Sequence, residues 1–220
     1  MARSNSKMRY YRIQKYCLLF LLSAPFNPGI AQHQEAAFAL LDSISQRSFQ
    51  ATFTYSSRSP QGELEATLEG KITVQGNQYR LTIDGQEVVS NGQTVWTYLK
   101  DANEVQITDH DPEQKAVTPW TIFANYRRDY TLCRFDTHQE NGHVYDSVEL
   151  LAKDVENSLS KVRITVERAT KHIECAQVTD NNQSRYSFFI TNFEYDLKFD
   201  KAFFSFNAEA HKGVEVIDMR

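Results

Sequence analysis

The stretch ELEATLEGKITVQ, residues 63–75, decides the fold. Every odd position in it is charged or polar, whereas the even positions are Leu64, Ala66, Leu68, Gly70, Ile72 and Val74. Since successive side chains of a strand point to opposite faces, this alternation predicts one long strand with a single wet face. The glycine in the middle of the apolar series predicts a bend or a bulge at that point.

Three glycine-containing dipeptides punctuate the chain on either side of strand-like runs. They are Asp84-Gly85, Asn91-Gly92 and Asn141-Gly142. Asp-Gly and Asn-Gly accept positive φ at both central positions of a type I′ hairpin turn, so the three pairs predict an antiparallel meander. Later strands are predicted at residues 159–167, 172–178, 185–195, 203–206 and 214–217.

Two segments carry helical signals instead. Residues 34–47 form one apolar stripe at three- and four-residue spacing, made by Ala37, Leu40, Leu41 and Ile44. Residues 118–124 begin with Thr-Pro, a helix start signal, and offer Trp120, Ile122 and Phe123 as apolar contacts.

About ten or eleven strands and two helices must therefore share one core. The prediction is a mostly-β (α+β) protein with a strongly curved antiparallel sheet. This sheet would form an incomplete β-barrel, with the helices lying across its open side.

The start of the chain has the pattern of a secretory signal. Five basic residues and no acid precede an apolar run at residues 16–24, and Gly29, Ile30 and Ala31 end the segment. The run is far shorter than the ~20 residues of a membrane helix, although an anchor left in place is the alternative. We expect residues 1–31 to be a signal peptide and residues 32–220 to form a single exported domain.

Charge and cysteine content narrow the classes of partner. The signal segment holds five of the 24 basic residues and none of the 28 acids, so the mature net charge is −9 instead of −4. This charge argues against nucleic acid and anionic membranes as partners. Cys133 and Cys175 remain after cleavage, and whether they form a disulfide is left open by the sequence.

No catalytic or cofactor motif is present. The chain lacks a nucleophile elbow, a zinc-protease helix motif, a phosphate-binding glycine loop and paired metal-binding cysteines. The six histidines are scattered over predicted loops and strand ends. We therefore expect no enzyme, no metal and no cofactor.

Aromatic side chains are in excess instead, with nine between residues 186 and 206. In the strand 185–195, Tyr186 and Phe188 point one way, and Phe189 and Phe193 the other. Both faces are apolar, so both are covered by packing or one faces a hydrophobic cavity. On this argument the aromatic residues Trp96, Tyr98 and Phe188 are predicted to line such a cavity.

Four motifs in this order resemble one known family. They are the helix followed by FQATF at 49–53, SNGQTVWTY at 90–98, TPWTIF at 118–123 and the ending AFFSFNAEAHKGVEVIDMR at 202–220. The chain resembles the periplasmic outer-membrane lipoprotein carrier proteins, the LolA-like family, over nearly all of its mature length.

The resemblance implies a location in the periplasm and a helical lid over a hydrophobic cavity that binds the acyl chains of lipoproteins. The implied lining comprises Leu41, Tyr79, Leu81, Trp120, Ile122 and Phe123, the last three on the lid. Many relatives have a basic residue and a proline where this chain has Gly76-Asn77. A cationic head-group contact cannot be transferred to that position, and nearby Arg80 is the substitute.

The implied partners follow from the carrier role. They are acylated lipoproteins, an ATP-driven lipoprotein-releasing complex in the inner membrane, and an acceptor at the outer membrane, with the carrier a monomer. Three alternatives stay open at this stage. The ligand is another lipid, such as a glycolipid or fatty acid; the barrel is filled and serves as an interaction or sensor module; or the chain is a hydrolase with an unrecognised site.

Overall fold

A computed structural model describes residues 28–110 and 126–220. Within these residues one long helix and twelve strands account for most of the chain. The helix is α1 (Pro28–Ser45). The strands are β1 (Phe49–Arg58), β2 (Leu64–Gln75), β3 (Gln78–Ile83), β4 (Gln86–Ser90), β5 (Thr94–Leu99), β6 (Glu104–Asp109), β7 (Tyr130–Glu140), β8 (His143–Ala152), β9 (Leu159–Glu167), β10 (Ile173–Asp180), β11 (Arg185–Tyr195) and β12 (Glu215–Asp218).

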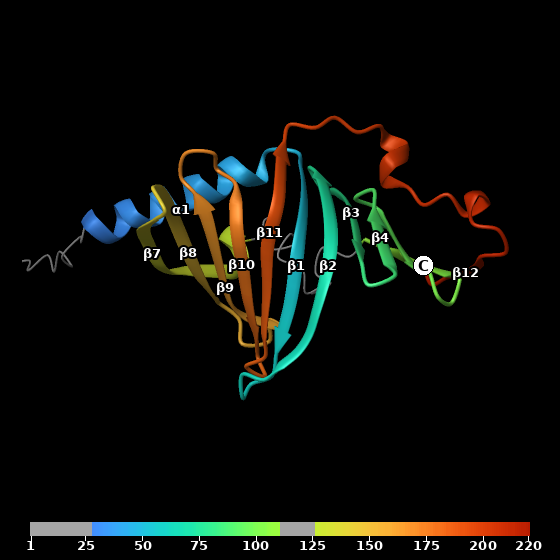
Figure 1. Ribbon diagram of the computed structural model, residues 1–220, viewed down its shortest axis with the longest axis horizontal. Coiled ribbons are helices and arrows are strands. Elements are labelled where there is room, and N and C mark those ends of the chain that lie inside the picture. The colour runs from blue at the N-terminus through green and yellow to red at the C-terminus, as the bar shows by residue number, and fades with distance from the viewer. Residues whose placement is uncertain (1–27, 111–125) are drawn as a thin grey trace, which may run out of the picture.

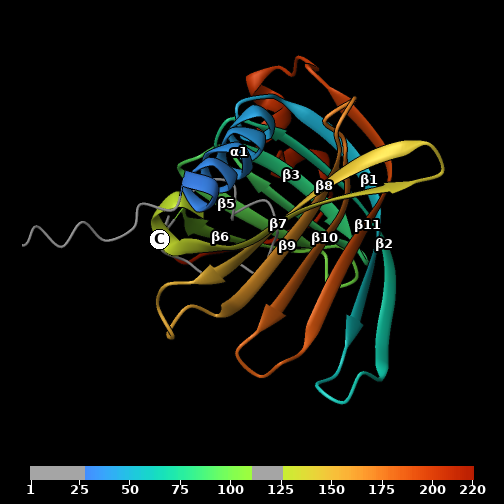
Figure 2. The ribbon, with the colours of Figure 1, turned by 90° about the vertical axis from the view of Figure 1, so that its left-hand side faces the viewer.

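All twelve strands belong to one sheet, in the order β12-β6-β5-β4-β3-β2-β1-β11-β10-β9-β8-β7. Neighbouring strands are antiparallel, except that β12 pairs parallel to β6. The sheet curves strongly without closing, so that β12 and β7 are its two edges (Figures 1 and 2). The predicted mostly-β fold with an unclosed curved sheet is confirmed.

Helix α1 lies inside the curve of the sheet (Figure 2). The predicted stripe is its buried face, because Ala37, Leu40, Leu41 and Ile44 are all buried in the main core cluster. Their partners come from both halves of the sheet and include Phe53, Ile72 and Ile164. Burying a Leu or Ile side chain contributes about 1.5–3 kcal/mol, so this stripe holds the helix on the sheet. The helix begins at Pro28, earlier than the sequence pattern predicted.

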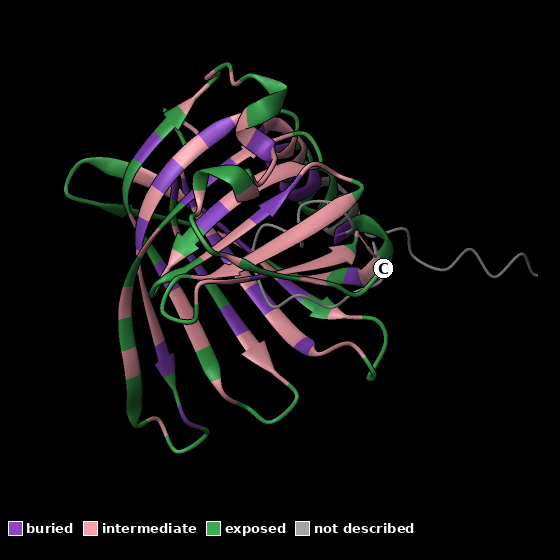
Figure 3. Ribbon diagram, turned by 90° about the vertical axis from the view of Figure 1, so that its right-hand side faces the viewer, coloured by how far each residue is buried: buried purple, intermediate pink, exposed green. Residues whose placement is uncertain are grey.

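The alternation of residues 63–75 is observed as a two-faced strand. Ile72 is fully buried, whereas Glu65, Thr67, Glu69 and Lys71 are exposed. Figure 3 shows buried and exposed residues alternating along the long strands.

Two of the three hairpin turns have the predicted backbone. Both residues have positive φ in Asp84-Gly85 (48° and 71°) and in Asn141-Gly142 (50° and 83°). In the third turn only Gly92 has positive φ, at 86°. There the side-chain Oδ1 of Asn91 accepts hydrogen bonds from the backbone N–H groups of Gln93 and Thr94 at 2.9 and 2.8 Å. These side-chain hydrogen bonds stabilise the turn, which is not the type I′ turn that the sequence predicted.

The prediction of a strand at residues 203–206 is wrong. Residues Lys201–Phe204 form a 3-10 helix, η1, and Ala208–Ala210 form a second, η2. Phe199, Phe203 and Phe204 contact one another with ring centroids 4.6 to 5.9 Å apart, which a strand with alternating side chains would not allow. The segment leaves β11 and runs to the β3–β6 end of the sheet before β12 pairs with β6 (Figure 1).

Cys133 on β7 and Cys175 on β10 are both free. Strands β8 and β9 lie between them, so three strand spacings of ~4.8 Å separate the two cysteines. A disulfide needs Cα atoms within ~7 Å, which this arrangement does not provide. No helix of the described residues combines the length and apolar character needed to cross a membrane.

Candidate functional site

The concave face of the sheet has two halves of different character. Under α1 the side chains from β1 and β8–β11 are buried in the main core cluster, among them Phe53, Val148 and Ile164. Toward β2–β5 the same face continues beyond these buried residues. There, apart from the buried Ile72 and Leu81, the apolar side chains are only half-buried.

Strand register defines this second half, because directly opposed residues share a face. Ile72 stands opposite Leu81, and Leu81 opposite Val88. Two residues along β2, Val74 stands opposite Tyr79. We call this surface the inner apolar face; its half-buried members are Leu68, Val74, Tyr79, Ile83, Val88, Val95 and Leu99.

The inner apolar face includes the hydroxyl groups of Tyr79 and of Ser90, which stands opposite Tyr79, and its far side on β5 and β6 is polar. Burial raises the pKa of Tyr79, which keeps its hydroxyl uncharged. On β5 and β6 the same face carries Thr97, Gln106 and Glu104. The amide Nε2 of Gln106 donates a hydrogen bond to Glu104 Oε1 at 2.8 Å. The face therefore grades from hydrocarbon at β2–β4 to hydrogen-bonding groups at β6.

Four of the predicted cavity residues lie on the concave side. Leu41 and Phe188 are buried within the core under α1, and Phe188 packs against the rings of Phe53 and Tyr55. Leu81 is buried in the same core cluster, at 8 % exposed, and Tyr79 is a partly buried residue of the inner apolar face that packs against this cluster. The three predicted lid residues, Trp120, Ile122 and Phe123, lie outside the described residues.

Trp96 and Tyr98 face away from this surface, so their prediction as cavity residues is wrong. Trp96 stands opposite Val89, which stands opposite Arg80, and this row is on the outer face. Tyr98 packs against Phe206 and His211 of the C-terminal segment, with ring centroids 5.2 and 4.6 Å apart. Both faces of β5 are apolar, and alternation alone could not tell which one points inward.

Arg80 also lies on the outer face, where its guanidinium group contacts other residues of the protein. Its Nη1 lies 3.3 Å from Glu87 Oε1, and its Nη2 donates to the backbone carbonyl of Ser205 at 3.2 Å. The guanidinium lies 4.9 Å from the ring centre of Phe203. Arg80 thus fastens the C-terminal segment, and the structure does not bring it to the inner apolar face.

A polar contact joins α1 to residues 126–129, which are helical. The carboxylate of Asp42 accepts hydrogen bonds from the Tyr126 hydroxyl and the Arg127 guanidinium. The Arg127 hydrogen bond holds the pKa of Asp42 below its usual value, and burial together with the Asp42 hydrogen bond raises the pKa of Tyr126 to about 12. This three-residue contact fixes the C-terminal end of the segment that follows β6.

The described residues hold no group of three or more His, Cys, Asp or Glu side chains that could bind a metal ion. A hollow of about 600 Å³ at the rim is formed where α1 ends, near Arg47 and Gly76. Arg47 and Asp196 form an ion pair there at 2.5 Å.

Several members of the inner apolar face were missed from the sequence. Val88, Val95 and Leu99 were not predicted, although the strands around Asp84-Gly85 were. The signal that could have found them is cross-strand register, since a two-residue hairpin turn fixes which residues stand opposite. Once Leu81 faces inward, Val88 must face inward too.

Comparison with known families agrees with this architecture. Residues 45–207 match the model of a family described as outer membrane lipoprotein carrier protein LolA. The chain belongs to the LolA family. Among the curated proteins, none matches its sequence.

Three solved structures that are similar to this one are distant from it in sequence. An uncharacterized conserved protein from Thermus thermophilus is 11 % identical, with a TM-score of 0.55 over 84 % of this chain and 98 % of that one. A LolA superfamily protein from Nitrosomonas europaea is 13 % identical, with a TM-score of 0.43 over 77 % and 97 %. The complex of MucA and MucB from Pseudomonas aeruginosa is 16 % identical, with a TM-score of 0.36 over 81 % and 62 %. At these identities the first likeness shows the fold alone.

Proposed function

We propose that the protein is a periplasmic carrier that binds the acyl chains of lipoproteins on its inner apolar face and shuttles them from the inner to the outer membrane. The observation that carries this proposal is the row of half-buried apolar side chains inside the curve, from Leu68 to Leu99. Membership of a lipoprotein carrier family supports it.

The energetics explain why such a face is needed. Each methylene taken out of water contributes ~0.8 kcal/mol. Transfer of a chain of about fifteen methylenes from a membrane into water therefore costs roughly 12 kcal/mol. A carrier must cover this hydrocarbon and still release it. A face whose apolar side chains are only half-buried, and that grades into the polar margin of Thr97, Gln106 and Glu104, suits both requirements.

The proposal includes the route as well as the ligand. Residues 1–31 serve as a signal peptide, and the mature carrier is a monomer. No catalytic step is part of this proposal, and we assign the energy for loading to an ATP-driven complex in the inner membrane. Release then goes to an outer-membrane acceptor that binds the acyl chains more tightly.

The test compares two charge insertions on opposite faces of one hairpin. Val88→Asp places a carboxylate on the half-buried inner apolar face, whereas Thr82→Asp places one at an exposed position on the outer face of β3. Binding of a tripalmitoylated lipopeptide is measured by titration. Because burying an unpaired polar group costs ~1–3 kcal/mol, we expect Val88→Asp to weaken binding at least about fivefold and Thr82→Asp to leave it unchanged.

As a control, a cooperative thermal unfolding transition is required of both variants, to show that each is folded. Equal lipopeptide binding by the two variants would contradict the proposed site. Free palmitate and a glycolipid are titrated in parallel. Tighter binding of either one than of the lipopeptide would favour a carrier of the same fold for another lipid.

A further inference from the structure

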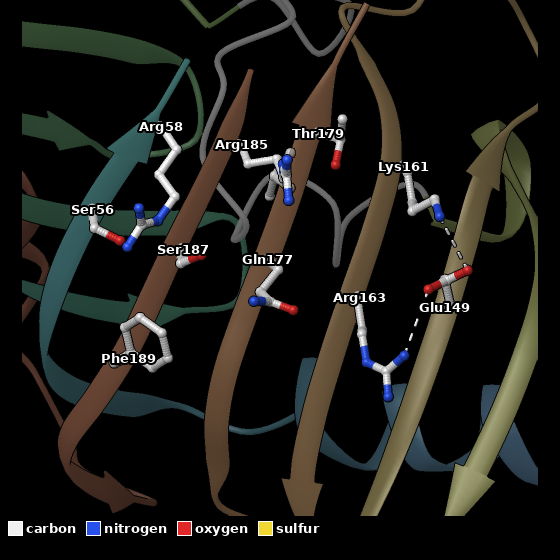
Figure 4. A pocket seen from close by; sticks show the side chains of 11 residues that line it. Ser56, Arg58, Glu149, Lys161, Arg163, Gln177, Thr179, Arg185, Ser187 and Phe189 are labelled. Atoms are coloured by element: carbon white, nitrogen blue, oxygen red, sulfur yellow. Dashed lines mark ion pairs between the residues drawn. The ribbon is translucent and has the colours of Figure 1, made fainter. Parts of the chain in front are cut away.

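A groove crosses the outer face of the sheet, on the opposite side from the inner apolar face. It has a volume of about 480 Å³ and spans β1, β11, β10, β9 and β8 (Figure 4). Strand register arranges its side chains in two rows. The first row is Arg58, Arg185, Thr179 and Lys161. The second row is Ser56, Ser187, Gln177, Arg163 and Glu149.

The groove is basic on a chain whose net charge is −4. Four of its lining residues are cations: Arg58, Lys161, Arg163 and Arg185. The one acid in the lining, Glu149, lies 3.4 Å from Lys161 and 3.6 Å from Arg163. Arg163 also lies 3.7 Å from Asp136 beyond the groove.

The cations nearer β1 are not neutralised in this way. Within the described part of the chain, Arg58 and Arg185 have no carboxylate within 4.0 Å. Arg58 donates to the carbonyl of Gly62 at 3.1 Å, which holds its side chain without cancelling its charge. Like charges on directly opposed residues of neighbouring strands repel each other, so the Arg58–Arg185 pair gains from an anion placed between them.

The shape of the groove favours a polypeptide segment over a bilayer surface. Gln177 and Ser187 add polar groups to the lining between the cations (Figure 4). A single extended chain can enter a hollow of this kind, whereas a flat layer of head groups meets only its rim. Apolar contacts lie beside the charges, because Phe189 is 48 % exposed and Leu151, opposite Lys161, is 39 % exposed. Aromatic side chains beside arginines are typical of protein-binding surfaces.

Dimensions define the segment that fits. Arg58 and Lys161 are three strand spacings apart, or about 14 Å at ~4.8 Å each, which equals about four residues of extended chain at ~3.4 Å per residue. In an extended chain, side chains on one side repeat every ~6.8 Å. Two or three carboxylates at alternate positions would therefore meet the cations of the first row.

We propose that this outer groove docks an extended acidic segment of a partner protein, with carboxylates at alternate positions and one apolar side chain against Phe189. The proposal does not depend on the nature of the cargo, because the groove and the inner apolar face lie on opposite faces of the sheet. Docking can then occur while cargo is bound.

The test uses a labelled eight-residue peptide with aspartates at alternate positions and one phenylalanine. Its affinity for the full mature chain is measured by fluorescence anisotropy at low and high salt. We expect Arg58→Glu/Arg185→Glu to weaken binding at least about tenfold, since two attractive charge pairs are lost and the reversed charges repel the peptide. Arg58→Gln/Arg185→Gln gives a milder version with a smaller risk of misfolding.

The matched control is Lys71→Glu, which reverses an exposed cation on the outer face of β2, away from the groove. It should change the affinity less than about twofold. A peptide with asparagine in place of aspartate should not bind, and anionic phosphatidylglycerol vesicles should bind more weakly than the acidic peptide. The proposal is overturned if the acidic peptide does not bind, if the groove variants and Lys71→Glu behave alike, or if the vesicles alone bind. Lipopeptide binding by the groove variants, expected to be unchanged, separates this outcome from failure of the carrier proposal.

Discussion

The ring of Phe53 occupies the space where a side chain at Gly70 would stand. The two residues are opposed across β1 and β2, and a Cβ atom at Gly70 would lie 2.4 Å from the Cζ atom of Phe53. Neither pairing of β2 has a register shift at Gly70, so no bulge interrupts the strand there. The glycine is needed for close packing of a core aromatic ring.

Gly70→Val should therefore destabilise the protein. The added methyl groups meet a fully buried ring in a packed core, and overpacking of this kind costs about 1–3 kcal/mol. Urea unfolding followed by circular dichroism measures the change. Adding Phe53→Leu should recover part of the loss, since the smaller side chain vacates the space; an additive double mutant would contradict the contact.

Tyr98→Ala distinguishes the two faces of β5. Tyr98 contacts Phe206 and His211, and its hydroxyl donates to Asn103 Oδ1 at 3.1 Å. We expect its removal to loosen the C-terminal segment and to lower the free energy of unfolding by about 1–3 kcal/mol, less than for a fully buried aromatic ring. Hydrogen exchange should rise at residues 206–217 while lipopeptide affinity stays within about twofold. A large loss of lipopeptide affinity without faster hydrogen exchange would contradict this assignment and would mean that Tyr98 contacts the ligand.

The contrast between β5 and residues 63–75 shows where sequence reasoning succeeds. In residues 63–75 one face is polar at every position, so alternation alone predicts the strand and its orientation correctly. In β5 both faces are apolar, because the C-terminal segment covers the outer one. That cover comes from residues about a hundred positions away in the sequence, and no local pattern shows it.

The same reasoning explains the missed 3-10 helix and the missed groove. Residues 203–206 have the composition of a strand, yet mutual packing with Phe199 and burial of Phe204 decide their conformation. Arg58, Lys161 and Arg185 are far apart in sequence and ordinary as single surface residues. Only the pairing of β1 with β11, and of β10 with β9, brings them into one row.

Acid sensitivity should depend on Asp146 more than on any exposed carboxylate pair. The side chain of Asp146 is 7 % exposed and accepts two hydrogen bonds from Arg168, at 2.8 and 2.5 Å, and one from Thr137 at 2.8 Å. The Arg168 hydrogen bonds lower the pKa of Asp146 below its usual value. A lowered pKa in the folded state means that the carboxylate stabilises the fold above its unfolded pKa of ~3.9, and that this contribution is lost as the pH falls through the folded pKa.

Asp146→Asn should thus lower the free energy of unfolding at neutral pH by about 1–3 kcal/mol, because a buried charged hydrogen-bond acceptor is lost. The difference from the unmodified protein should shrink as the pH falls below ~4, where Asp146 itself becomes protonated. Urea unfolding at a series of pH values measures both curves. Asp218→Asn is the control: Arg220 lowers the pKa of Asp218 to about 2, but both side chains are more than 40 % exposed, so solvent screens the pair and stability should hardly change. A gap between Asp146→Asn and the unmodified protein that stays constant from neutral to acidic pH would show that packing, and not the charge of Asp146, accounts for its contribution.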